Sequence, residues 1–267
     1  MREVKLYVQL LDHTPLPENL VAMAARLCYS GAQVEELSQK VAAADQSAFL
    51  DRLMEMGHLS PVEHPSFTFG VEGVSRALLA QITRHRIASF SVQSQRYVSQ
   101  SRKGGLAYIM PPSIRELGQE AQEEYARQME TLQGWYEQWV ERLGGKGEKA
   151  NEDARFVLPN AAETKLMVTM NARELRHLFS LRCCRRAQWE IRAMAWAMLG
   201  FCLAEAPKLF EKAGPGCIAG QCPEGTKSCG QCAQVRAKRE ELLQFVSEHK
   251  GEENFAAELS RWARENT

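Results

Sequence analysis

The first quarter of the chain changes from alternating to helical spacing of its apolar residues. Residues 4–11 alternate loosely between apolar and polar side chains, which predicts a strand. Residues 17–28 place apolar side chains three and four positions apart, which predicts a helix, and residues 34–56 predict one or two more. Two prolines preclude a regular helix in residues 58–65, so we expect a loop there.

The remaining pattern favours helices over strands. Alternation predicts strands at residues 67–71, 106–110 and 163–170. Helical spacing predicts helices at residues 76–85, 113–143, 151–158 and 187–212, with Ser75 and Asn171 as N-caps of the helices that follow them. No regular strand–helix–strand series is present. The expected class is therefore α+β, a helix-rich domain with a small, mostly antiparallel sheet.

Composition divides the chain near residue 213. The 267 residues are 45% hydrophobic, enough to bury a substantial core. Residues 213–232 are rich in Gly and Cys, and a highly charged segment with helical character follows to residue 267. We therefore expect a main domain over residues 1–212 and a Cys-rich segment with a charged helical tail over residues 213–267.

Two features predict a cytoplasmic protein with no membrane segment. The first five residues are already charged and lack the apolar core of a signal peptide. The longest apolar run, residues 193–204, is too short to span a bilayer and predicts a buried helix. The eight cysteines would then be reduced.

Positive charge is concentrated although the chain has 33 basic and 33 acidic residues. Residues 73–115 contain no acid but seven bases: Arg76, Arg84, Arg86, Arg96, Arg102, Lys103 and Arg115. Serines and glutamines lie between the arginines, and this combination suits phosphate because guanidinium groups bind it in a bidentate way. The alternative is a solvated basic face.

A second cluster of bases lies at residues 173–186. Two such clusters predict two phosphorylated ligands, or the two ends of one large ligand. Nucleic acid is a further alternative, but a neutral pI of about 7.0 and the scarcity of Lys-rich runs argue against it.

Several motifs in these clusters carry a resemblance to a known family. Arg84-His85-Arg86, seven further residues and then Ser94 form the signature of flavin-dependent thymidylate synthases, and Gln95-Arg96-Tyr97 continues it. The segments at 155–159, 171–175 and 181–190 are similar to the family's other motifs, in the family's order. The resemblance covers residues 1–212.

The resemblance implies a homotetramer with FAD-containing active sites at subunit interfaces. It also implies reductive methylation of dUMP to dTMP, with 5,10-methylenetetrahydrofolate as one-carbon donor and NADPH as reductant through FAD. Arg182 would stabilise negative charge on the uracil ring, which is worth about 3 kcal/mol in comparable sites. Neither a cysteine nor Ser94 is assigned as a nucleophile, because Ser94 has no adjacent base in the sequence to activate it.

The resemblance assigns site residues position by position. The FAD-binding residues would be Ser60, Arg84, His85, Arg86, Asn171, Arg173 and His177. The dUMP-binding residues would be Gln81, Arg84, Ser94, Gln95, Arg96, Arg155 and Arg182, with Arg84 from different subunits serving both ligands. Two positions depart from the family's usual pattern: Val92 replaces an acidic residue, and His177 replaces an amide.

Four cysteines of the C-terminal segment have the spacing of a possible metal site. Cys217, Cys222, Cys229 and Cys232 lie within 16 residues, and four thiolates can bind zinc tetrahedrally. A loop of reduced or disulfide-linked cysteines is an equal alternative. With the two arginine clusters, this segment also leaves open a non-enzymatic nucleotide- or nucleic-acid-binding module with a zinc knuckle.

Overall fold

A computed structural model describes residues 2–100, 106–145 and 147–266. Arg102 and Lys103 of the acid-free stretch lie outside these ranges. The strands are β1 (Arg2–Glu3), β2 (Tyr7–His13), β3 (Ser66–Ser75), β4 (Ala88–Val92), β5 (Ala107–Tyr108) and β6 (Glu163–Asn171). The α-helices are α1 (Pro17–Leu27), α2 (Val34–Ala42), α3 (Ser47–Glu55), α4 (Arg76–Ile82), α5 (Pro112–Glu116), α6 (Gln119–Arg142), α7 (Glu148–Ala154), α8 (Ala172–Arg182), α9 (Trp189–Glu205), α10 (Pro207–Phe210), α11 (Cys232–His249) and α12 (Phe255–Glu265). Short 3-10 helices are η1 (Pro61–Glu63), η2 (Arg155–Val157) and η3 (Gly225–Lys227).

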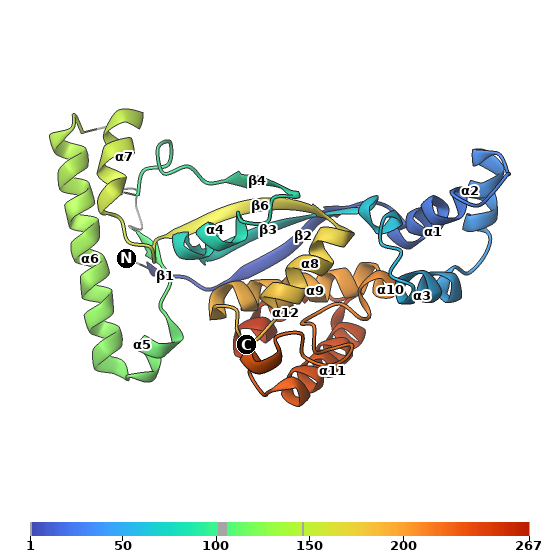
Figure 1. Ribbon diagram of the computed structural model, residues 1–267. Coiled ribbons are helices and arrows are strands. Elements are labelled where there is room, and N and C mark those ends of the chain that lie inside the picture. Colours follow the sequence, from blue (N-terminus) through green and yellow to red (C-terminus); the bar gives the residue numbers. More distant parts are fainter. Residues whose placement is uncertain (1, 101–105, 146, 267) are drawn as a thin grey trace. The chain divides into compact units, whose positions relative to one another are not determined.

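The main sheet has four strands in the order β2-β3-β6-β4 (Figure 1). Thr68 hydrogen-bonds Thr169, and Lys165 pairs with Glu72. Residue numbers therefore rise along β3 as they fall along β6, which makes this pair antiparallel. A separate two-stranded sheet pairs β1 with β5 in parallel. The predicted α+β class, rich in helix with a small antiparallel sheet, is confirmed.

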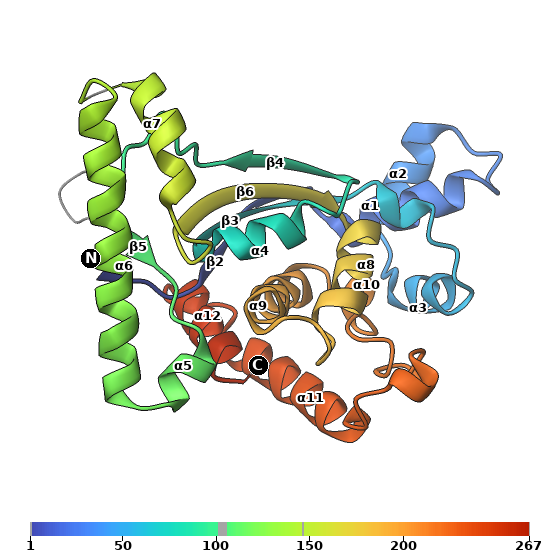
Figure 2. The same ribbon diagram turned by 60° about the vertical axis from the view of Figure 1, so that its left-hand side comes forward.

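The described residues form two compact units whose segments alternate along the sequence. Unit 1 comprises residues 2–7, 71–84 and 90–167, and unit 2 comprises residues 8–70, 85–89 and 168–266. In unit 1, α6 and α7 lie side by side (Figures 1 and 2) and enclose a small core around Tyr136 and Val140. Gly73 is required in this unit, since its φ is +67° and an added Cβ would lie 2.0 Å from the carbonyl oxygen of Lys5.

Unit 2 is built around α9, which is buried along nearly its whole length. This helix packs against α8, α10, α11 and α12 (Figure 2), which explains why its sequence is apolar on all sides. Arg239 on α11 is 2% exposed, and its guanidinium group donates to the carbonyls of Phe210, Glu211 and Ala213. It thereby holds α11 against the backbone at and directly after the end of α10.

The predicted elements are mostly present, with specific corrections. The expected helix over 113–143 is divided into α5 and α6, because Gly118 adopts a φ of +99° between them. The expected helix over 187–212 ends at Glu205, and Pro207 starts α10. The strand expected at residues 4–11 is β2, which is shifted to Tyr7–His13, and β1 and β4 were not predicted. Among the described residues, no helix is both long and apolar enough to cross a membrane.

Candidate functional site

The start of α8 brings two predicted FAD-binding segments together within unit 2. The side-chain oxygen of Asn171 accepts from the Glu174 N–H at 2.8 Å, which confirms Asn171 as the N-cap. The Ala172 N–H donates to the carbonyl of Pro65 at 2.9 Å, so the 58–65 loop lies at this helix start. In the same loop, Glu63 forms an ion pair with Arg173. Ser60, three residues before Glu63, is exposed there.

His85 and Arg182 meet although 97 positions separate them in the sequence. Arg182 Nε donates to His85 Nε2 at 3.2 Å, and His85 Nδ1 lies 3.0 Å from Glu174 Oε1. His177 lies one turn after Glu174 on α8, and its ring stands edge-on to His85 at 5.9 Å between centroids. The two family motifs that carry these residues therefore meet directly in unit 2.

His85 is 5% exposed, and its environment favours the neutral imidazole. Burial lowers the pKa of His85, and the positive charge of Arg182 lowers it further, while the hydrogen bond to Glu174 acts in the opposite direction. Arg86, the next residue, is exposed, as are Arg173 and His177 on α8. Unit 2 thus presents exposed donors around one buried, uncharged histidine.

Arg96, predicted to bind dUMP, is paired with acids of α7 in unit 1. Its guanidinium group forms ion pairs with Glu148 and with Glu152, the latter at 2.9 Å. The Asn151 amide donates to the Arg96 carbonyl at 2.9 Å, and Asn151 in turn accepts from the Tyr136 hydroxyl. These bonds fix the backbone of the signature segment against α7, while the side chain stays about 40% exposed.

Two further dUMP-binding candidates of unit 1, Ser94 and Arg155, have local partners. Ser94 Oγ accepts from the Arg96 N–H at 3.2 Å, so the hydroxyl shapes the turn that carries Arg96. Arg155 Nε donates to the carbonyl of Glu152 at 3.1 Å. Burial lowers the pKa of Arg76, and the positive charge of nearby Arg155 lowers it further, so two arginines share this part of unit 1.

The predicted site residues are divided between the two units. Ser60, His85, Arg86, Asn171, Arg173, His177 and Arg182 belong to unit 2, whereas Gln81, Arg84, Ser94, Gln95, Arg96 and Arg155 belong to unit 1. Four acids beside these residues were not predicted as part of the site: Glu63, Glu148, Glu152 and Glu174. Only Glu174 had a sequence signal, because an acid three positions after an N-cap is typical of a helix start.

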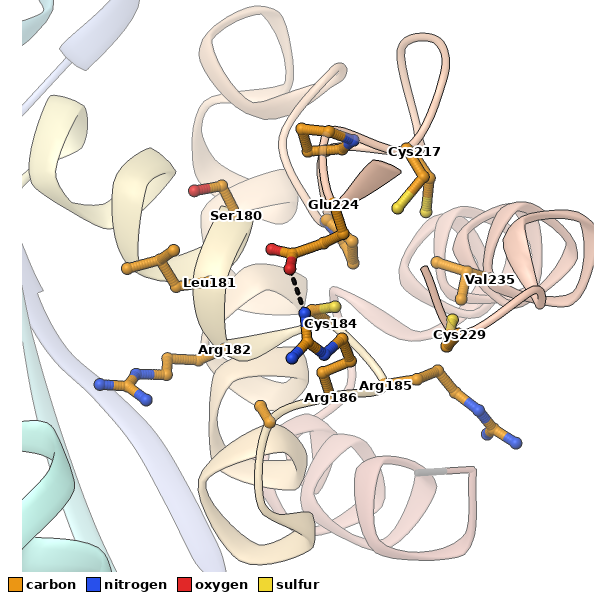
Figure 3. A pocket seen from close by; sticks show the side chains of 15 residues that line it. Ser180, Leu181, Arg182, Cys184, Arg185, Arg186, Cys217, Glu224, Cys229 and Val235 are labelled. Atoms are coloured by element: carbon orange, nitrogen blue, oxygen red, sulfur yellow. Dashed lines mark hydrogen bonds and ion pairs between the residues drawn. The ribbon is translucent and has the colours of Figure 1, made fainter. Parts of the chain in front are cut away.

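A cavity of about 340 Å³ in unit 2 lies between the end of α8 and the Cys-rich loop (Figure 3). Cys184, Cys217, Cys222 and Cys229 contribute to its lining, and Arg186 forms an ion pair with Glu224 across it. Figure 3 shows the Arg182 side chain directed away from Cys217 and Cys229. The cavity therefore presents thiols on a different side of α8 from the His85 contact.

Burial controls the acidity of Cys217, one of the cysteines that line this cavity. It raises the pKa of Cys217 to about 11, and the thiol of Cys232 lies within hydrogen-bonding distance of the Cys217 thiol. The pKa of Cys222 is lowered, chiefly by a hydrogen bond from Ser228. All eight cysteines are free thiols, so the disulfide-linked alternative for this loop is not adopted here.

Comparison with known proteins identifies the class. A family model described as thymidylate synthase complementing protein matches residues 9–208. A protein of Geobacter sulfurreducens named flavin-dependent thymidylate synthase is 52% identical over 86% of this chain and 96% of its own length. One of the same name from Clostridium tetani is 48% identical over 86% of this chain and 95% of its own.

A solved structure gives the same result for the fold. The UMP/dUMP methylase PolB of Streptomyces cacaoi, bound with 5-Br dUMP, superposes with a TM-score of 0.61 at 27% identity, covering 79% of this chain and 96% of that one. The fold and the motif residues thus define a thymidylate synthase complementing protein. More specifically, the chain belongs to the flavin-dependent thymidylate synthase family.

Proposed function

We propose that the chain catalyses the reductive methylation of dUMP to dTMP, with FAD as cofactor, NADPH as reductant and 5,10-methylenetetrahydrofolate as one-carbon donor. The folate supplies a CH₂ group, and NADPH supplies the one hydride that turns it into a methyl group at C5 of the uracil ring. The proton displaced from C5 and one further proton go to the two folate nitrogens that held the CH₂ group. Tetrahydrofolate and NADP⁺ are the other products. The family membership and the relatives' names support this reaction.

One structural observation carries the proposal. The contact between Arg182 and His85 joins the two motifs that the family resemblance assigned to substrate and cofactor. Arginine suits the uracil because a fixed positive charge stabilises the negative charge that develops on the ring during attack. In this proposal Arg182 is the catalytic residue, and it contacts the substrate.

The residues of unit 2 fit a flavin dinucleotide by their chemistry. Ser60, Arg86, Arg173 and His177 are exposed and offer hydroxyl, guanidinium and imidazole donors, which suit a diphosphate. Arg173 is paired with Glu63 and would exchange that partner for the cofactor. When bound, FAD supplies the hydride chemistry, and these side chains hold it.

The test is spectroscopic and kinetic. The purified protein should show oxidised flavin absorbance, and its reduced form should reoxidise in a dUMP-dependent manner with methylenetetrahydrofolate. Arg182→Ala should retain flavin and lose nearly all dTMP formation. A colourless protein that takes up no FAD would instead favour the non-enzymatic nucleotide-binding module.

The assembly is part of the same proposal. We expect a homotetramer in which different subunits supply Arg96 and Arg182 to one site. Mixing inactive Arg96→Ala with inactive Arg182→Ala subunits should then restore part of the activity, whereas mixing either variant with itself should not. Residues 1–212 as the catalytic region and a cytoplasmic location remain predictions.

Zinc binding by Cys217, Cys222, Cys229 and Cys232 is a separate part of the proposal. Three of these thiols line one cavity, and that of Cys232 lies within reach of both Cys217 and Cys222. Thiolates are preferred zinc ligands, and a bound ion would hold the loop beside the end of α8. Protein purified under reducing conditions should contain about one zinc per chain, whereas Cys229→Ser with Cys232→Ser should contain almost none. Metal-free wild type would refute the site.

A further inference from the structure

Glu174 is a buried acid inside the site that no part of the proposed reaction uses. It is 8% exposed and lies three positions after the N-cap of α8, where the N-terminus of a helix favours negative charge. Its carboxylate oxygen lies 3.0 Å from Nδ1 of His85. A buried carboxylate needs a partner to offset its lost hydration, and His85 provides one.

The hydrogen bonds on the two sides of His85 fix its tautomer. Arginine has only donors, so Nε2 of His85 must accept from Arg182 and cannot carry a proton. The proton of the neutral ring is then on Nδ1, from which it is donated to Glu174. The three residues form a directed chain in which Arg182 donates to His85 and His85 donates to Glu174.

We propose that Glu174 is a positioning residue that acts through His85 to orient the guanidinium group of Arg182. This inference rests on the proposed function, in which Arg182 faces the uracil. Without Glu174, the imidazole could carry its proton on Nε2 and point that N–H at the donor of Arg182. The two donors would then repel, and Arg182 would lose its orientation.

A metal site is the alternative interpretation of the same cluster, and the position of Arg182 argues against it. Ligand atoms of His85, Glu174 and His177 lie within 4.8 Å of one another, as in a metal site. However, Nε2 of His85 already accepts from Arg182 and its Nδ1 faces Glu174, so the imidazole has no remaining lone pair for an ion. The guanidinium group would also repel a cation at this distance.

Two substitutions of Glu174 separate positioning from simple structural support. Glu174→Ala removes the acceptor and should lower kcat by about 10- to 100-fold, as loss of such an orienting partner typically does. Glu174→Gln keeps a carbonyl acceptor for the Nδ1–H and should retain most of the activity. Both variants should keep bound flavin, and the KM for dUMP should change less than kcat.

The control breaks a histidine–glutamate pair elsewhere in unit 2. His13 Nε2 lies 3.3 Å from Glu205, and Glu205→Ala should leave kcat unchanged. Wild-type kcat in Glu174→Ala would overturn the inference. So would recovery of that variant's activity by excess FAD, since Glu174 would then act only in cofactor binding.

A measurement on the unmodified protein tests the tautomer without turnover. In the NMR spectrum of protein with ¹⁵N-labelled histidine, the ring signals of His85 are those that disappear in the His85→Gln variant. The ¹⁵N shifts of these signals should be those of a neutral ring protonated on Nδ1. Shifts of a ring protonated on Nε2 would overturn the inference. This test uses the wild type, so it holds even if Glu174→Ala fails to fold. If the wild type gives no dUMP-dependent flavin reoxidation, the proposed function fails while this measurement still stands.

Discussion

The Val8 N–H donates to the hydroxyl of Ser260 at 2.9 Å, across 252 positions of the sequence. This buried bond joins β2 to α12 within unit 2, and Ser260 is fully buried. Ser260→Ala should lower the free energy of unfolding by about 1–3 kcal/mol, because it leaves a buried N–H without its acceptor. Chemical denaturation measures the change. Ser247→Ala, at an exposed position on α11, is the control and should be nearly neutral.

Gly73 in unit 1 and Gly57 in unit 2 offer a matched pair that separates a steric clash from backbone strain. Both have a positive φ, of +67° and +70°, so alanine is strained at either position. An added Cβ at Gly73 meets the Lys5 carbonyl, whereas nothing lies within 4 Å at Gly57. Gly73→Ala should therefore destabilise by several kcal/mol and Gly57→Ala by about 1 kcal/mol. Equal shifts in thermal unfolding would mean that strain alone, without the clash, determines the cost.

The neutral state of His85 predicts a pH dependence of stability. Its folded pKa is lowered from 6.5, so between the two values the unfolded chain binds more protons than the folded one. The contribution is fully present above about pH 6.5 and is lost as the pH falls toward the folded pKa. Glu174, Arg182 and His177 are the charged or titratable groups that face this ring.

His85→Gln isolates this contribution, since glutamine offers a donor and an acceptor but does not titrate. The free energy of unfolding should fall less steeply below about pH 6.5 in the variant than in the wild type. Denaturant titrations across this range measure both slopes. Parallel curves would show that His85 protonates equally in the folded and unfolded chains.

Arg96 should bind dUMP more tightly when its acidic partners on α7 are removed. Glu148 and Glu152 compete with an incoming phosphate for the guanidinium group. Exposed ion pairs contribute up to about 1 kcal/mol, so Glu148→Gln with Glu152→Gln should lower the KM for dUMP by about two- to fivefold at low salt.

The control for this prediction is Glu36→Gln, which breaks the exposed pair with Lys40 on α2 in unit 2. It should leave the KM for dUMP unchanged. High salt should reduce the difference between the double variant and the wild type, because it screens the same ion pairs. An unchanged KM at low salt would indicate that the acids and dUMP do not share Arg96.

Local interactions were predictable from the sequence, whereas tertiary partners were not. Ser75 and Asn171 were predicted as N-caps, because a cap depends only on a side chain and the backbone two or three residues later. Gly118 was read as an ordinary helical residue, although its positive φ divides α5 from α6. The strand β4 was missed although Ala88, Phe90 and Val92 alternate with serines, because those serines were assigned to phosphate binding.

The same distinction holds for the candidate site. The motifs identified His85 and Arg182, but no local pattern indicates that Glu174 would be buried against Nδ1 of His85 while Arg182 contacts Nε2 of the same ring. The partners of Arg96 are another example, because Glu148 lies 52 positions later and only the packing of α7 brings it close. Sequence patterns therefore located the cations of the site but not the acids that orient or compete with them.

The bond between Val8 and Ser260 has a consequence for how the protein is made. The ribosome releases β2 early, but the Ser260 hydroxyl that accepts from the Val8 N–H emerges 252 residues later. Unit 2 therefore cannot reach its final packing while most of the chain is still being synthesised, and contacts of such long sequence separation form slowly. Until Ser260 is synthesised, only water can accept from the Val8 N–H in place of that hydroxyl, so we expect the growing chain, more than the finished enzyme, to expose surface that chaperones bind.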